Sequence, residues 1–193
     1  MLHSRATRVL GRIENQNYEN ALRSIENTIS DESVSINDIV DIKTGDNTLH
    51  RLFQGGISSH ELKDFMSKFD SETILNRENK SGITPIDYLF TTGNVSLLQH
   101  LEDFTDFDIK SHSSKFGNGL HLAARKDNPR FISFLLSRGV DSNDINASGK
   151  RPIDVARRYA NFQNIDVFEF AHENPDRFRT LFKQNNNEEG FTP

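Results

Sequence analysis

The chain has 193 residues, of which 34% are hydrophobic, and its formal net charge at pH 7 is −5. It contains no cysteine, which excludes disulfide bonds, thiolate zinc sites and a cysteine nucleophile. Arginines interrupt the apolar positions of the first residues, and no run approaches the roughly 18 apolar residues of a membrane span, so we expect neither a secretory signal nor a membrane helix.

The N-terminal segment predicts one amphipathic helix followed by a hairpin. Tyr18, Leu22, Ile25 and Ile29 recur at helical spacing and make one apolar face. Residues 34–46 are expected to form the hairpin that follows. We assign residues 1–43 as a helical N-terminal cap or a degenerate structural repeat.

Four later segments begin in the same way. When Leu49, Ile86, Leu120 and Ile153 are aligned, the spacings between them are 37, 34 and 33 residues. The aligned sequences are TLHRL from Thr48, TPIDYL from Thr84, GLHLAA from Gly119 and RPIDVA from Arg151. This period predicts four repeats, at residues 44–78, 79–112, 113–145 and 146–172.

The third repeat gives the clearest helix signals. A first helix is expected over Leu120–Arg125, and Asn128 and Pro129 predict the cap and first position of a second helix. Gly139 predicts its left-handed end. We expect Leu120, Leu135 and Ile153 to be buried between repeats.

The first two repeats carry related start and stop signals. Ser58 and Glu61 have the spacing of a capping box, and Thr84 can cap a helix that opens at Pro85. Gly93 separates the two helices of the second repeat. The extra residues of the 37-residue spacing are placed in the connection between residues 70 and 80.

The C-terminal segment predicts a helical cap and a polar tail. Residues 162–171 are expected to form the second helix of the fourth repeat, and Asn174 and Pro175 start another helix. A repeat array needs such a cap because its last apolar face would otherwise meet water. We assign residues 173–193 as this cap with a disordered tail, which begins near Gln184.

The period of about 33 residues and the T-P-L-H-x-A-like core resemble the ankyrin-repeat family. The resemblance covers residues 44–172 and implies an all-α ankyrin-repeat solenoid, in which helix-turn-helix repeats are joined by β-hairpin loops. The first repeat departs from the pattern, with Thr48 at the proline position and Leu52 at the small alanine. Because such repeats are scaffolds for binding, the resemblance implies protein–protein interaction and no enzyme activity.

No catalytic, metal-binding or cofactor-binding residue is predicted. His50 and His121 stand at the motif histidine, which in the family ties neighbouring hairpins and helices together. Asp87 and Asp154 take the same position in the other repeats, where we expect them to cap local backbone. The segment from His60 to Asp64 begins like a zinc-protease helix but has no second histidine.

The resemblance implies a binding groove lined by hairpin tips and by the exposed side of each first helix. Residues 111–160 carry 9 Lys and Arg against 4 Asp and Glu, whereas residues 1–110 carry 11 against 18. An acidic partner is therefore predicted, although an ordinary solvated charged face is the competing interpretation. The predicted partner-binding residues are basic or aromatic: Lys80, Lys115, Phe116, Arg125, Lys126, Lys150, Arg158 and Tyr159.

We expect a monomeric, cytoplasmic protein that binds an acidic protein segment or surface and neither nucleic acid nor membrane. The short array would also suit a bacterial effector or a viral host mimic acting in the host-cell cytoplasm. Two alternatives stay open. One is an inhibitory ankyrin regulator that masks a transcription factor or signalling protein, and the other is an enzyme with activity in the N-terminal segment.

Overall fold

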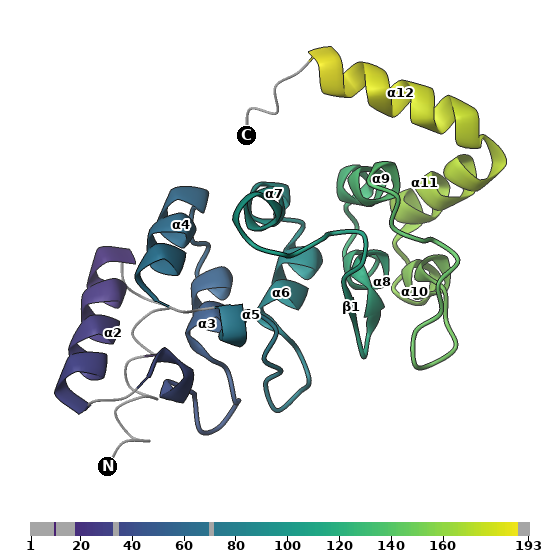
Figure 1. The fold of residues 1–193 in the computed structure, drawn as a ribbon. Helices are drawn as coiled ribbons and strands as arrows, with labels where there is room; N and C mark the ends of the chain where they lie inside the picture. The colour runs from purple at the N-terminus through teal and green to yellow at the C-terminus, as the bar shows by residue number, and fades with distance from the viewer. Residues whose placement is uncertain (1–9, 11–17, 33–34, 70–71, 189–193) are drawn as a thin grey trace. The chain divides into compact units, whose positions relative to one another are not determined.

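The computed structural model of the chain describes residue 10 and residues 18–32, 35–69 and 72–188. This part of the chain is mostly helical, which confirms the predicted helical class (Figure 1). It divides into two compact units. The first extends to Leu89 and includes Asn94–Asp106, and the second contains Phe90–Gly93 and the chain from Phe107 onward.

The first unit begins with the predicted N-terminal helix, which buries Leu22 and Ile25. Helix α4 contacts α7, and α3 contacts α5. The elements of this unit are α2 (Tyr18–Glu32), the 3-10 helix η1 (Ile36–Asp38), α3 (Thr48–Gln54), α4 (Ser59–Lys68), α5 (Glu72–Leu75), α6 (Pro85–Thr92) as far as Leu89, and α7 (Val95–Phe104).

The second unit is built from two pairs of contacting helices and a C-terminal helix. Contacts join α8 to α9 and α10, α11 to α9 and α10, and α12 to α9 and α11. Its elements are β1 (Ser113–Ser114), β2 (Gly117–Asn118), α8 (Gly119–Ala123), α9 (Pro129–Ser137), α10 (Pro152–Arg158), α11 (Phe162–Glu173) and α12 (Pro175–Glu188). Strands β1 and β2 pair as an antiparallel hairpin that leads into α8.

The predicted helix starts are confirmed by side-chain caps. The Ser58 side chain accepts from the backbone N–H of Glu61, whose carboxylate accepts from the backbone N–H of Ser58. The Thr84 hydroxyl accepts from the backbone N–H of Asp87 at 3.2 Å. Asn128 caps α9 in the same way, with Pro129 as the first helical residue. These contacts satisfy N–H groups that have no partner within their helix.

The turns that follow α3, α6 and α9 each contain a left-handed glycine. Gly56, Gly93 and Gly139 have φ values of 80°, 73° and 82°, as a left-handed helix end requires. Ala160 takes the same role between α10 and α11 with a φ of 54°, and it is the one residue other than glycine with positive φ in the described part of the chain. The backbone N–H of Asn161 closes this turn by donating to the Ala156 carbonyl at 3.0 Å.

Two expectations about the second unit are wrong. Ile153 is partly exposed, because Pro152 and Ala156 form the buried stripe of α10 and Ile153 is turned from Pro152 by about 100° around the helix axis. Helix α12 continues through the predicted start of the tail at Gln184 and ends at Glu188. Extending an existing helix by one residue costs far less than starting one. Residues 189–193 lie outside the described residues.

Leu120 and Leu135 are fully buried, as predicted. They belong to the core of the second unit, together with Phe90, Phe131, Ile132, Ala156 and Phe168. Leu49, Leu62, Phe65, Ile86, Leu97 and Leu101 are core residues of the first unit. No helix within the described ranges is long and apolar enough to cross a lipid bilayer.

Candidate partner-binding surface

The chain segment that follows α8 is held in place by two asparagines from the start of α11. Asn161 donates a hydrogen bond from Nδ2 to the Ala124 carbonyl at 2.8 Å. Asn164, which is fully buried, donates from Nδ2 to the Lys126 carbonyl at 2.6 Å. The backbone on both sides of Arg125 is therefore fixed to α11, while the Arg125 side chain is exposed.

The Arg125 guanidinium lies near two aromatic rings. Its Cζ is 5.8 Å from the ring centroid of Phe116, in the β1–β2 turn, and 5.7 Å from that of Tyr159, at the end of α10. The Lys115 ammonium also lies over the Phe116 ring, at 5.0 Å. These distances are within the range of cation–π attraction. We call Lys115, Phe116, Arg125 and Tyr159 the arginine–aromatic cluster.

The basic side chains predicted for this surface differ from the neighbouring arginines in their ion pairs. Arg151 and Arg157 both form ion pairs with Asp154, and Arg157 also pairs with Glu169 at 3.1 Å. Within the described residues, no ion pair forms at Lys115, Arg125, Lys126, Lys150 or Arg158, all of which are exposed. The cations of the predicted surface are therefore not neutralised by a carboxylate of this part of the chain.

Lys80 does not belong with this surface. It lies in the first unit, where its Nζ donates to the Ile42 carbonyl at 2.6 Å and its backbone N–H donates to the Thr44 carbonyl at 2.9 Å. Its position is explained by these two bonds, which fix the turn that precedes α3. The seven other predicted residues all lie in the second unit.

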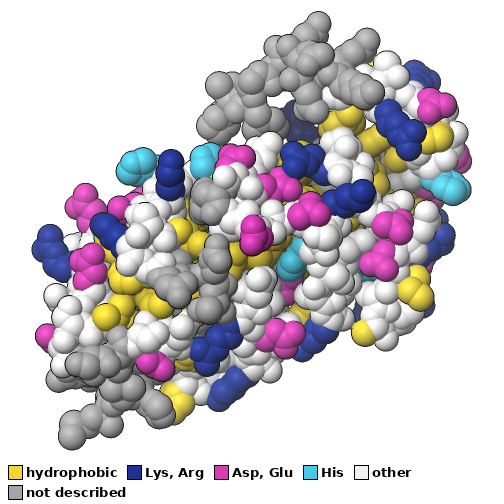
Figure 2. All heavy atoms as spheres, in the orientation of Figure 1, with side chains coloured by type: hydrophobic (Ala, Val, Ile, Leu, Met, Phe, Trp, Pro, Cys, Tyr) yellow, Lys and Arg dark blue, Asp and Glu magenta, His cyan; other side chains and the backbone are white. Residues whose placement is uncertain are grey.

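The face drawn in Figure 2 is not uniformly basic. Figure 2 shows basic and acidic side chains interspersed on the face that it draws. The excess of Lys and Arg in residues 111–160 therefore does not by itself make a basic surface, and the contacts of each side chain have to be considered. The arginine–aromatic cluster is the one place where contacts between described residues join predicted cations to predicted aromatic residues.

His121 stabilises the turn that carries this surface. Its Nδ1 accepts from the backbone N–H of Asn118 at 3.2 Å, and its Nε2 lies 2.8 Å from the Lys150 carbonyl. Because a carbonyl can only accept, Nε2 carries a proton. Asn118 in turn donates from Nδ2 to the Asp141 carbonyl at 2.7 Å.

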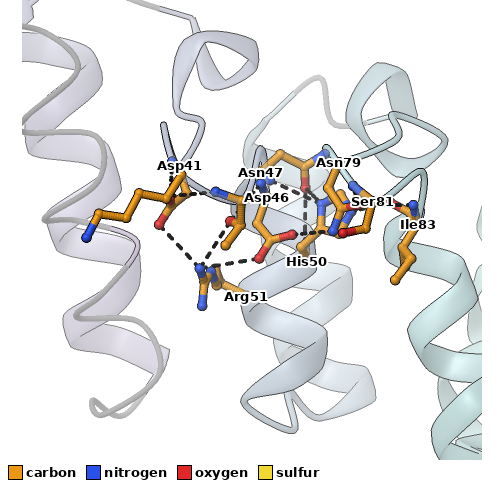
Figure 3. A network of polar contacts seen from close by, with 10 residues as sticks. Asp41, Asp46, Asn47, His50, Arg51, Asn79, Ser81 and Ile83 are labelled. Carbon is orange, nitrogen blue, oxygen red and sulfur yellow. Dashed lines mark hydrogen bonds and ion pairs between the residues drawn. The ribbon is translucent and has the colours of Figure 1, made fainter.

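The first unit repeats this arrangement around His50 (Figure 3). His50 Nδ1 accepts from the backbone N–H of Asn47, and its Nε2 lies 2.8 Å from the Ile83 carbonyl. Asn47 donates from Nδ2 to the Ile74 carbonyl, 27 residues ahead, whereas Asn118 reaches 23 residues ahead. The four extra residues of the first repeat therefore come before Ile74. The predicted placement between residues 70 and 80 holds only for the positions before Ile74, and part of the insertion lies in the preceding helix α4.

A buried ion-pair network adjoins His50 in the first unit (Figure 3). Arg51 lies 3.3 Å from a carboxylate oxygen of Asp41 and 3.3 Å from one of Asp46. Burial alone would raise the pKa of Asp41, but the backbone N–H groups of Thr44 and Lys43, together with Arg51, outweigh it and hold that pKa below its usual range. Both carboxylates are thus committed to fixing the turn before α3.

Acid should destabilise both units before their carboxylates are protonated. Burial lowers the pKa of His50 and of His121, although the carbonyls of Ile83 and Lys150 oppose the shift. As pH falls below about 6.5, unfolded histidine takes up a proton that the folded state resists, so the free energy of unfolding decreases. Urea unfolding at a series of pH values between 7 and 5 measures this decrease.

The control for this pH dependence is His121→Asn, which keeps a side-chain acceptor but does not titrate. The variant should be less stable at pH 7, since the bond to the Lys150 carbonyl is lost. Its stability should fall less steeply between pH 6.5 and pH 5 than that of the unchanged chain. Equal slopes for the two proteins would contradict the assignment to His121.

The remaining chemistry-bearing residues have local structural partners. Asp87 and Asp154 accept from the backbone N–H groups of Thr84 and Arg151, as predicted for capping residues. Asp64 accepts from Lys68 and from the Tyr18 hydroxyl. No group of three or more His, Asp or Glu side chains within the described ranges is arranged to hold a metal ion.

The residues that sequence reasoning missed are those that support the surface. Asn161 and Asn164 were not singled out, although an asparagine before a helix is a recognisable capping signal. Asn161 makes no side-chain cap in α11, and Asn164 lies inside that helix; both donate through Nδ2 to the segment around Arg125. A comparison with models of known protein families finds no family that matches this chain.

Proposed function

We propose that this chain is a non-catalytic protein-binding module of the ankyrin-repeat type, and that the arginine–aromatic cluster binds an acidic segment of a partner protein. The observation that carries the proposal is the placement of Arg125. Its guanidinium lies within cation–π distance of two aromatic rings, and it forms no ion pair with a carboxylate of the described chain. Arginine and tyrosine are also among the residues that most often dominate interface energies.

The recurrence of one hydrogen-bond arrangement supports the repeat assignment. Asn47 with His50, and Asn118 with His121, use the same atoms for the same contacts, and each histidine reaches a carbonyl in a following turn. The sequence period places these histidines in register. A structural unit that is used twice with the same polar contacts is what a repeat protein requires.

Reversing two charges of the surface should abolish binding. In Arg125→Glu/Lys126→Glu the cation near the two rings becomes an anion, and the partner's carboxylates are repelled. We expect a fluorescein-labelled glutamate-rich peptide to bind the unchanged chain and to bind this variant at least about tenfold more weakly, as measured by fluorescence anisotropy. Binding by the unchanged chain should weaken as salt is raised, because exposed charges are screened over about 8–10 Å.

The matched control is Arg130→Glu/Lys110→Glu. These two exposed residues lie in the same unit but outside the cluster, and their reversal changes the net charge by the same amount. The control should bind the peptide nearly as well as the unchanged chain, with an unaltered circular dichroism spectrum. Equal loss in both variants would mean that net charge alone attracts the peptide, and no loss in either would refute this site.

A further inference from the structure

An exposed apolar side chain follows the cluster residue Tyr159 by three positions in the chain. Phe162, the first residue of α11, is 70% exposed, and Tyr159 is 45% exposed. Phe162 follows Asn161, whose amide binds the carbonyl of Ala124, the residue before Arg125. Phe162 and Arg125 are thus each one residue away from the same hydrogen bond, which brings their two backbone segments together.

The contacts of Arg125 decide which part of its guanidinium can meet a ligand. The Phe116 and Tyr159 rings both lie within cation–π distance of the Arg125 Cζ. Its N–H groups lie in the plane of the guanidinium and make no hydrogen bond to any described residue. The free edge has the geometry that binds a carboxylate through two parallel N–H···O bonds, and a side chain held by rings loses little entropy when it binds.

We propose that the partner is a segment in which a glutamate or aspartate adjoins an apolar side chain. The carboxylate binds the edge of Arg125, and the apolar side chain covers Phe162 and Tyr159. This inference rests on the proposed function and makes it specific. An acidic segment without the apolar residue would leave Phe162 exposed, and an apolar segment without the acid would leave Arg125 without a counter-charge.

Two labelled peptides of equal length and equal glutamate content test the inference. One carries leucines among its glutamates and the other carries serines. We expect the unchanged chain to prefer the leucine peptide by about tenfold, since burying a leucine against Phe162 removes apolar surface from water. Phe162→Ser should remove this preference while leaving binding of the serine peptide unchanged, because it deletes only the apolar contact.

Arg125→Lys tests the edge-on carboxylate separately, since it keeps the charge but lacks the planar fork. We expect both peptides to bind this variant about tenfold more weakly. The inference is overturned if Phe162→Ser keeps the leucine preference, or if Arg125→Lys binds like the unchanged chain. Those outcomes leave the proposed function intact when Arg125→Glu/Lys126→Glu still abolishes binding. A third peptide with phosphoserine in place of glutamate would overturn the carboxylate assignment if it bound more tightly.

Discussion

Leu120→Ala should lower the free energy of unfolding by about 2–5 kcal/mol, because it removes buried apolar atoms and leaves a cavity. Leu120 is fully buried in α8, a helix of five residues that are all buried and that contacts α9, α10 and β2. A helix this short has almost no stability of its own, since isolated helices of fewer than roughly 12–15 residues are marginal in water. Its place in the unit depends on packing.

The measurement is urea unfolding followed by circular dichroism, with the slope compared between variants so that a change in midpoint reports stability. Ile145→Ala is the matched control. It deletes a similar apolar volume in the same unit, but Ile145 is 64% exposed, so its effect should stay within about 0.5 kcal/mol. Similar losses for the two variants would contradict the packing assigned to α8.

Gly119→Ala should destabilise the second unit by about 1–3 kcal/mol through overpacking. A Cβ at this position would lie 2.3 Å from Cε1 of Phe90 and 2.5 Å from its Cδ1. The Phe90 ring cannot move aside easily, because it is fully buried and stacks on His112 at 4.9 Å. The clash therefore has to be relieved by shifting the core or α8.

A double-mutant cycle with Phe90→Leu identifies the clash as the cause. Phe90→Leu should by itself destabilise the unit. In the Phe90→Leu background, however, Gly119→Ala should lower the free energy of unfolding by at least about 1 kcal/mol less than it does with Phe90 present. Additive effects of the two substitutions would show that the methyl group and the ring do not meet. In that case the loss of stability in Gly119→Ala would arise within α8 and not from a clash with Phe90.

Helix positions were predictable from sequence because their signals are local. The Ser58–Glu61 capping box, the Thr84 cap and the Asn128–Pro129 start each depend on residues within one helical turn, and each occurs in the structure. The burial of Leu135 followed from the apolar stripe of its helix, and that of Leu120 from the register of the repeats. The exposure of Ile153 could not be predicted in this way. In a seven-residue helix the apolar positions do not fix which side faces the core, and this is decided only when neighbouring helices pack against it.

The candidate surface was predictable only as a set of residue types. Register placed Phe116, Arg125 and Tyr159 on adjacent repeats, but whether an arginine meets a carboxylate or an aromatic ring depends on distances of a few ångströms between segments far apart in the chain. Lys80 has the same charge as Arg125, yet its ammonium is bound to the Ile42 carbonyl. Charge alone could not separate these two cases.

The sequence by itself determined the period, the helical class and the start of most helices, because periodicity and capping act over a few residues. Only the tertiary structure decided that Asn161 and Asn164 hold the backbone on both sides of Arg125, and that Asp154 and Glu169 engage Arg157 while no described carboxylate engages Arg125. Apart from the Asp154–Arg157 pair, these contacts join residues more than ten positions apart. Their energies depend on distance and on exclusion of water, which the order of residues does not specify.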